Sequence, residues 1–148
     1  MIATPAGATP LLIALSGLPG AGKSTLATAV AHRLGAVHLR IDTIEDALLA
    51  LGGADIVNEG GGYAVAYALA ADNLRLGLTV VADSVNPVAL TRTAWRDVAA
   101  RSGCTMLSVH VVCSDVQEHE RRIRARPTGT RGSDWEKICN RVLEPAAD

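Results

Sequence analysis

Aromatic residues are scarce in this chain of 148 residues, where they make up 3% of the sequence and phenylalanine is absent. The interior therefore has to be built from valine, leucine, isoleucine and alanine, since apolar residues still supply 49% of the chain. No unbroken apolar run approaches the ~20 residues that a membrane-spanning helix requires. We therefore expect a globular protein with no membrane partner.

Cysteine and lysine are also sparse. The three cysteines are widely spaced and form no C-x-x-C pair, which argues against a disulfide framework or a zinc site. They are typical of small core residues in a reducing compartment, so we expect a cytoplasmic protein. The formal net charge is −1, which disfavours a nucleic-acid partner or a polybasic membrane anchor. Only Lys23 and Lys137 are lysines, and the other basic residues are arginines.

The order of the apolar segments predicts the fold class. Apolar segments that alternate with helical patterns are typical of an α/β protein, a three-layer αβα arrangement with a parallel sheet of four to five strands. The predicted strands cover residues 11–15, 36–41, 78–82 and 106–113.

The length fits one domain. We expect a loose tail over residues 1–10 and a single domain over residues 11–148. The glycines of residues 52–62 predict a long loop there, and long loops in compact domains are often functional.

One segment matches a phosphate-binding loop. Residues 17–24 follow a predicted strand, precede a predicted helix and fit the pattern G-x-x-x-x-G-K-[ST]. Its glycines let backbone N–H groups converge on phosphate oxygens, its lysine bridges phosphates, and its final hydroxyl holds Mg²⁺. We therefore predict ATP and Mg²⁺ as cofactors, with Ser24 as a metal ligand. The predicted nucleotide-binding residues are Gly17, Leu18, Pro19, Gly20, Ala21, Gly22, Lys23, Ser24 and Thr25.

Two acids follow the second and third predicted strands, where ligands of parallel sheets bind. Asp42 is placed to accept the proton of a substrate hydroxyl, but it also fits a capping box with Glu45. Asp83 is placed to hold Mg²⁺ or substrate, or else to shape a turn. Asn86 is either a substrate contact or a turn residue before proline.

Arginines gather near residues 121–126. Arg122 and Arg126 lie four residues apart and share a helix face, as suits a lid that brings guanidinium groups to a transferred phosphoryl group. We predict this lid over about residues 122–133, with Lys23, Asp42, Arg122 and Arg126 as catalytic residues. The alternative is a solvated basic face paired with Glu118 and Glu120.

The segment around the glycine-rich residues supplies the predicted acceptor pocket. Glu59, Tyr63 and Tyr67 border this segment, and the two tyrosines are again four residues apart. The alternative is that Tyr67 packs in the core and Glu59 is solvated.

These residues together resemble the small P-loop kinases of the predicted-kinase, AAA_33-like, group. Relatives include gluconate kinase, chloramphenicol phosphotransferase, zeta toxins and the kinase domains of polynucleotide kinases. The resemblance implies an adenylate-kinase-like sheet of order 2-3-1-4, with a fifth strand in relatives. It also implies transfer of the ATP γ-phosphate to a small-molecule hydroxyl, with Asp42 as base.

Two departures from those relatives refine the expectation. Polynucleotide-kinase-like members often carry an arginine shortly after the catalytic acid, whereas Asp42 is followed here by Glu45 and Asp46, which favours a neutral or cationic acceptor. We also expect the chain to be one strand and helix shorter at its C-terminal end than those relatives. We expect a monomer or homodimer. The alternatives are a nucleoside or nucleotide kinase and an ATP-binding module without catalysis.

Overall fold

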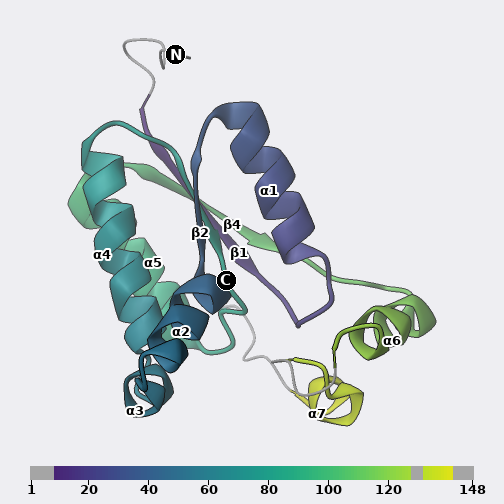
Figure 1. Ribbon diagram of the computed structural model, residues 1–148. Helices are drawn as coiled ribbons and strands as arrows, with labels where there is room; N and C mark the ends of the chain where they lie inside the picture. The colour runs from purple at the N-terminus through teal and green to yellow at the C-terminus, as the bar shows by residue number, and fades with distance from the viewer. Residues whose placement is uncertain (1–8, 128–131, 142–148) are drawn as a thin grey trace.

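The computed structural model describes residues 9–127 and 132–141. Its centre is a parallel sheet of four strands, as the sequence predicts, in the order β2-β3-β1-β4 that the resemblance implies. Strands and helices alternate along the chain, and Figure 1 shows helices on both faces of the sheet. The elements are β1 (Leu11–Ser16), α1 (Lys23–Leu34), β2 (Val37–Arg40), α2 (Ile41–Ala50), α3 (Ala54–Asn58), α4 (Gly61–Arg75), β3 (Val80–Asp83), α5 (Ala89–Ser102), β4 (Thr105–His110), α6 (Val116–Arg124) and α7 (Trp135–Cys139).

Two apolar layers hold the helices to the sheet. Successive residues of a strand point to opposite faces, so Leu12 packs with α4 and α5, while its neighbour Ile13 packs with α1. The layer under α4 and α5 contains the fully buried Trp95, whose ring packs edge-on against Tyr67 at 4.6 Å. The aromatic-poor core is thus completed by small side chains, as Ala66 and Ala70 are both fully buried.

Two parts of the chain differ from the sequence-based prediction. The second helix begins at Ile41, because β2 stops at Arg40, so Asp42 lies inside the first helical turn. The glycine-rich residues 52–62 do not form one long loop, since they contain α3 and the start of α4. Glycine permits this tight junction, because a Cβ at Gly61 would lie 2.3 Å from the Ile56 side chain.

The fourth strand also differs from the predicted apolar strand. It pairs only with β1 among the described residues, so it forms an edge of the sheet, and half of the Leu107 side chain is exposed. No fifth strand occurs in the described part of the chain. The predicted tail and lid lie partly outside the described residues, as does the C-terminal end of the predicted domain.

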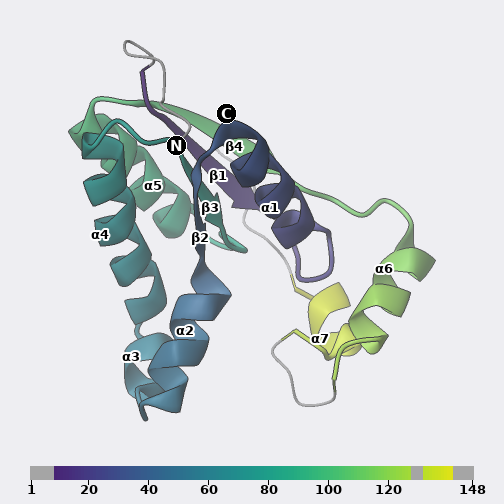
Figure 2. The same cartoon turned by 45° about the horizontal axis from the view of Figure 1, so that its top comes forward.

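Two pairs of helices extend beyond the carboxyl ends of the strands. The α2–α3 pair and the α6–α7 pair lie at the same end of the sheet, on either side of the ends of β1 and β3 (Figure 2). The loop between β1 and α1 also lies at this end. Within the described ranges, no helix is both long and apolar enough to cross a membrane.

Candidate active site

A cavity of about 1390 Å³ opens at the carboxyl ends of the strands. It is lined by the loop before α1, the junction of β2 and α2, the end of β3, and helices α6 and α7. This is the position where parallel sheets bind ligands, because the loops that follow the strands converge there. The predicted phosphate loop and the predicted acids therefore share one cavity.

The phosphate loop owes its shape to glycine. Gly17, Gly20 and Gly22 have φ of 137°, 78° and 104°, conformations that other residues rarely adopt. A Cβ at Gly17 would also lie 2.2 Å from the carbonyl oxygen of Val111, so no side chain fits there. Lys23 folds back into the loop and donates to the Leu18 carbonyl at 2.9 Å.

The Lys23 ammonium is a buried charge. Its residue is only 8% exposed, and desolvation lowers the pKa of Lys23 from 10.5 to about 8, although Asp83 and Asp42 oppose the shift. Arg126 and Arg141 lie close enough to lower that pKa further. This desolvated cation lies near the two arginines and forms no ion pair in the described residues, so it is poised to receive an anion, because phosphate oxygens would supply a direct counter-charge.

Asp42 faces the same cavity from the first turn of α2. Its side chain is 52% exposed and lies 3.8 Å from the Arg40 guanidinium. The N-cap residue of α2 is Arg40, and no side-chain hydrogen bond caps this helix. The capping interpretation of Asp42 is therefore wrong, because the helix starts two residues too early for the Asp42 side chain to act as its cap.

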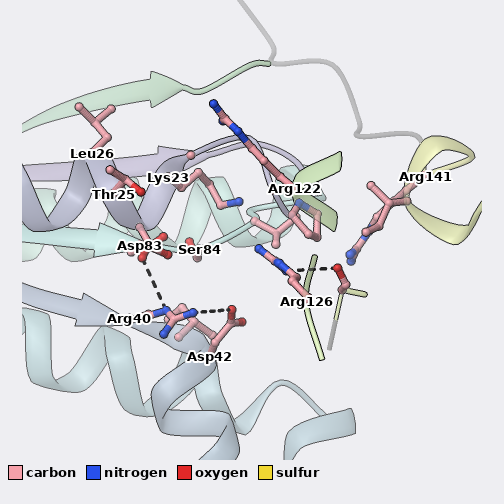
Figure 3. A pocket seen from close by; sticks show the side chains of 18 of the residues that line it. Lys23, Thr25, Leu26, Arg40, Asp42, Asp83, Ser84, Arg122, Arg126 and Arg141 are labelled. Atoms are coloured by element: carbon pink, nitrogen blue, oxygen red, sulfur yellow. Dashed lines mark hydrogen bonds and ion pairs between the residues drawn. The ribbon is translucent and has the colours of Figure 1, made fainter. Parts of the chain in front are cut away.

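Asp83 is the buried acid of the site. It ends β3 with 3% exposure, and its Oδ2 lies 3.3 Å from His38 Nε2 and 3.9 Å from Arg40 Nε. Figure 3 shows the Arg40 guanidinium between Asp42 and Asp83. A buried carboxylate requires such partners, since burial without compensation is costly.

The sequence alone does not single out His38 and Arg40. The only signal is their spacing, because residues two apart on a strand share a face. Their partner Asp83 is about forty residues away along the chain, and only the parallel pairing of β2 with β3 brings the three side chains together.

The arginines of α6 are partly paired. Glu118 accepts hydrogen bonds from Arg121 and Arg122, both at 2.7 Å, and these bonds lower the pKa of Glu118 to about 2. Arg122 nevertheless lines the cavity with its side chain 43% exposed. Arg126 also lines the cavity and donates to the Gly132 carbonyl at 3.2 Å. The helix face is thus ion-paired, as the alternative interpretation predicts, and Arg122 and Arg126 also reach the cavity (Figure 3). The role of this segment as a lid stays a prediction.

Tyr63 is the one predicted acceptor-pocket tyrosine that lines the cavity. Its hydroxyl accepts a hydrogen bond from the backbone N–H of Asn86 at 3.1 Å, and burial raises the pKa of Tyr63. The neighbouring Ser84 also lines the cavity and is 5% exposed. Its Oγ is near the Tyr63 hydroxyl but makes no hydrogen bond of good geometry within the described residues.

Three predicted contacts lie elsewhere, which corrects the expectation for them. Glu59 is exposed at the end of α3, and Tyr67 packs on Trp95 and donates to the Thr91 carbonyl. Asn86 is 2% exposed, and its side-chain amide donates to the Leu15 carbonyl and accepts from the Trp95 indole. Its polar atoms are used inside the protein, so they do not face the cavity.

The donor set suits a magnesium ion held mainly by a nucleotide. Ser24 lines the cavity at the start of α1 beside Lys23, where its hydroxyl would hold Mg²⁺. Asp83 lies nearby, but its Oδ2 already faces His38 and Arg40. The described residues contain no cluster of three or more acids, histidines or cysteines that could hold a metal alone. Phosphate oxygens would therefore complete the coordination.

A comparison with known protein families assigns the chain to one of them. A sequence model of the AAA_33 family, described as an AAA domain, matches residues 12–138. No curated protein matches the chain.

Several solved structures share the fold. A candidate kinase from Chloroflexus aurantiacus is 25% identical with a TM-score of 0.73, covering 93% of this chain and 79% of that one. The Mycobacterium tuberculosis APS kinase in complex with AMPPNP and APS is 22% identical with a TM-score of 0.72, covering 94% and 85%. A gluconokinase from Sinorhizobium meliloti is 20% identical with a TM-score of 0.59, covering 93% and 77%. The fold predicted from the sequence is confirmed.

Proposed function

The chain belongs to the AAA_33 family and has the fold of small P-loop kinases, and on that premise we propose that it transfers the γ-phosphate of ATP to a hydroxyl group of a small molecule. One observation carries the proposal. The buried Lys23 in the phosphate loop and the exposed carboxylate of Asp42 line the same cavity. A phosphate-binding cation and a general base are the two groups that such a transfer requires together.

The nucleotide occupies the basic side of the cavity in this proposal. Lys23 contacts the β- and γ-phosphates, and two arginines, one on α6 and one just after it, stabilise the negative charge that builds on the transferred group. Arg122 and Arg126 line that side. Mg²⁺, held by Ser24 and the phosphates, supplies further charge neutralisation when bound.

The acceptor occupies the opposite side, near the ends of β2 and β3. Asp42 accepts the proton of the acceptor hydroxyl, and its exposure leaves it accessible to a bound alcohol. The buried Ser84 hydroxyl offers a further hydrogen-bonding group to the acceptor. Asp83 is proposed to anchor Arg40 beside Asp42 and to contact the substrate or the hydrated metal.

Charge on this side of the cavity favours one class of acceptor. Among its described lining residues, Asp42, Glu45 and Asp83 are acidic, whereas Arg40 is basic. An anionic acceptor would face this excess of carboxylates at short range, where repulsion is least screened by water. We therefore favour a neutral or cationic alcohol, such as a sugar or an amino alcohol.

A panel of small alcohols, scored for ADP release from Mg·ATP, tests the proposal. Asp42→Asn should lower turnover by about 10²- to 10⁴-fold, the range expected for a general base. Its affinity for ADP should change by less than about threefold, because Asp42 contacts the acceptor in this proposal rather than the phosphates. Asp46→Asn is the matched control, since Asp46 is an exposed acid one turn further along α2. Its turnover should equal that of the native protein.

Two outcomes would favour other functions. Turnover of nucleosides or nucleotides, with none of sugars, amino alcohols or antibiotics, would favour a nucleoside or nucleotide kinase. Tight ATP binding without ADP formation across the whole panel would favour an ATP-binding module without catalysis.

A further inference from the structure

The α6 helix docks directly on the phosphate loop through a buried histidine. His119 is 7% exposed, and its Nε2 lies 2.7 Å from the carbonyl oxygen of Pro19. A carbonyl oxygen only accepts hydrogen bonds, so Nε2 carries the hydrogen and donates it. The imidazole also packs against Trp135 of α7 in an edge-on arrangement, with the two ring centroids 5.2 Å apart.

A second contact brings the same helix against the loop. Ile123, one turn after His119, is fully buried, and a Cβ at Gly20 would lie 2.5 Å from its Cδ1 atom. Gly20 therefore has two roles. Its φ of 78° shapes the loop, and its missing side chain lets α6 approach.

Peptide geometry links the histidine to phosphate binding. The C=O and N–H of a trans peptide point in opposite directions, and the structure contains no cis peptide bond within its described residues. Fixing the Pro19 carbonyl toward His119 therefore directs the Gly20 N–H away from α6. The N–H groups of this loop are the ones expected to meet phosphate oxygens.

We infer that His119 is a positioning residue that holds the Pro19–Gly20 peptide in the orientation needed for phosphate binding and ties α6 to the phosphate loop. It does not touch the nucleotide. Two of the arginines that line the cavity, Arg121 and Arg122, lie on the same helix, so this hydrogen bond also aligns the loop with the helix that carries them. The orientation of the loop follows from the contacts of α6 with Pro19 and Gly20, whereas the consequence for nucleotide binding rests on the proposed function.

Two substitutions separate the hydrogen bond from simple packing. His119→Leu keeps an apolar volume but removes the donor, whereas His119→Gln retains an amide N–H at similar reach. His119→Asn, which is polar but too short, replaces the leucine variant should that one not fold. His32→Leu is the matched control, because His32 is an exposed histidine on α1.

Hydrogen exchange of the ligand-free protein tests the positioning itself. We expect the loop amide of Ala21, which donates to the Leu18 carbonyl at 3.2 Å, to exchange at least about tenfold faster in His119→Leu, and at nearly the native rate in His119→Gln and His32→Leu. Native-like exchange in His119→Leu would overturn the inference. So would equally fast exchange in His119→Gln, because packing rather than the hydrogen bond would then hold the loop.

Calorimetry with Mg·ADP tests the consequence. Loss of one well-placed hydrogen bond should weaken ADP binding by about tenfold in His119→Leu, with recovery to within about threefold in His119→Gln. Unchanged affinity in His119→Leu would contradict the link to nucleotide binding. Absence of ADP binding by the native protein would instead refute the proposed function, and hydrogen exchange would still decide whether His119 holds the loop.

Discussion

Replacing Lys23 with methionine is expected to stabilise the fold while it abolishes nucleotide binding. The pKa of Lys23 falls from 10.5 to about 8 in the folded protein. Each pKa unit corresponds to about 1.4 kcal/mol, so the charged lysine costs about 3 kcal/mol of folding free energy at pH 7. Methionine removes that cost but loses the hydrogen bond to Leu18, which contributes about 1 kcal/mol. The net expected gain is about 2 kcal/mol.

The direction of the Lys23 pKa shift determines how the stability of the fold changes with pH. The folded pKa of Lys23 lies below the unfolded value, so between about pH 8 and 10.5 the unfolded chain binds more protons and stability rises with pH. The folding free energy lost by burying charged Lys23 is therefore largest below about pH 8 and falls to roughly half of that value by pH 9.5. The advantage of Lys23→Met over the native protein should shrink accordingly.

Urea unfolding at pH 7 and pH 9.5 measures both effects. Lys137→Met is the matched control, because Lys137 is the only other lysine and its side chain is 85% exposed. With two lysines in the chain, NMR titration of labelled lysine side chains also gives the pKa of Lys23 directly. A Lys23→Met protein that is less stable than the native one, by the same margin at both pH values, would refute the reasoning.

Two further predictions concern residues around the site. Asn86→Ala should lower the unfolding free energy by about 2–4 kcal/mol in urea titrations, because it leaves the buried Trp95 indole N–H without its acceptor and puts alanine at a φ of 47°. A loss below about 1 kcal/mol would show that the buried hydrogen bonds of the Asn86 side chain contribute little to the stability of the fold. Glu118→Gln should tighten ADP binding severalfold and steepen its salt dependence in calorimetry, because Arg121 and Arg122 lose the carboxylate that neutralises them. Weaker binding would mean that Glu118 orients these arginines for the nucleotide.

The fold class and the phosphate loop follow from local sequence. Apolar strands that alternate with helices specify a parallel sheet, and the loop pattern depends on residues within one turn of chain. The helix boundary at Ile41 was missed because Asp42 and Glu45 also form a valid capping pattern, which the extended backbone of Arg40 supersedes. The short α3 was missed because glycines on both sides of it suggest a loop.

Contacts between distant segments account for the rest of the site. His38 and Arg40 matter to the site because they contact Asp83. His119 matters because it contacts Pro19, which is a hundred residues away along the chain. Asn86 precedes a proline, which is typical of a turn residue, yet its side-chain amide links β1 to α5 by hydrogen bonds. Such roles depend on strand order and helix docking, which residue spacing along one segment does not specify.

Transfer of a labelled phosphoryl group tests the central claim most directly. ATP carrying heavy oxygen in its γ-phosphoryl group would be incubated with Mg²⁺, a metabolite extract and the protein, and the products analysed by mass spectrometry. The account predicts that the native protein and Asp46→Asn move the label to an alcohol of low molecular mass, and that Asp42→Asn does so at least about a hundredfold more slowly. Label that stays in ATP, or that appears only in inorganic phosphate, would contradict it.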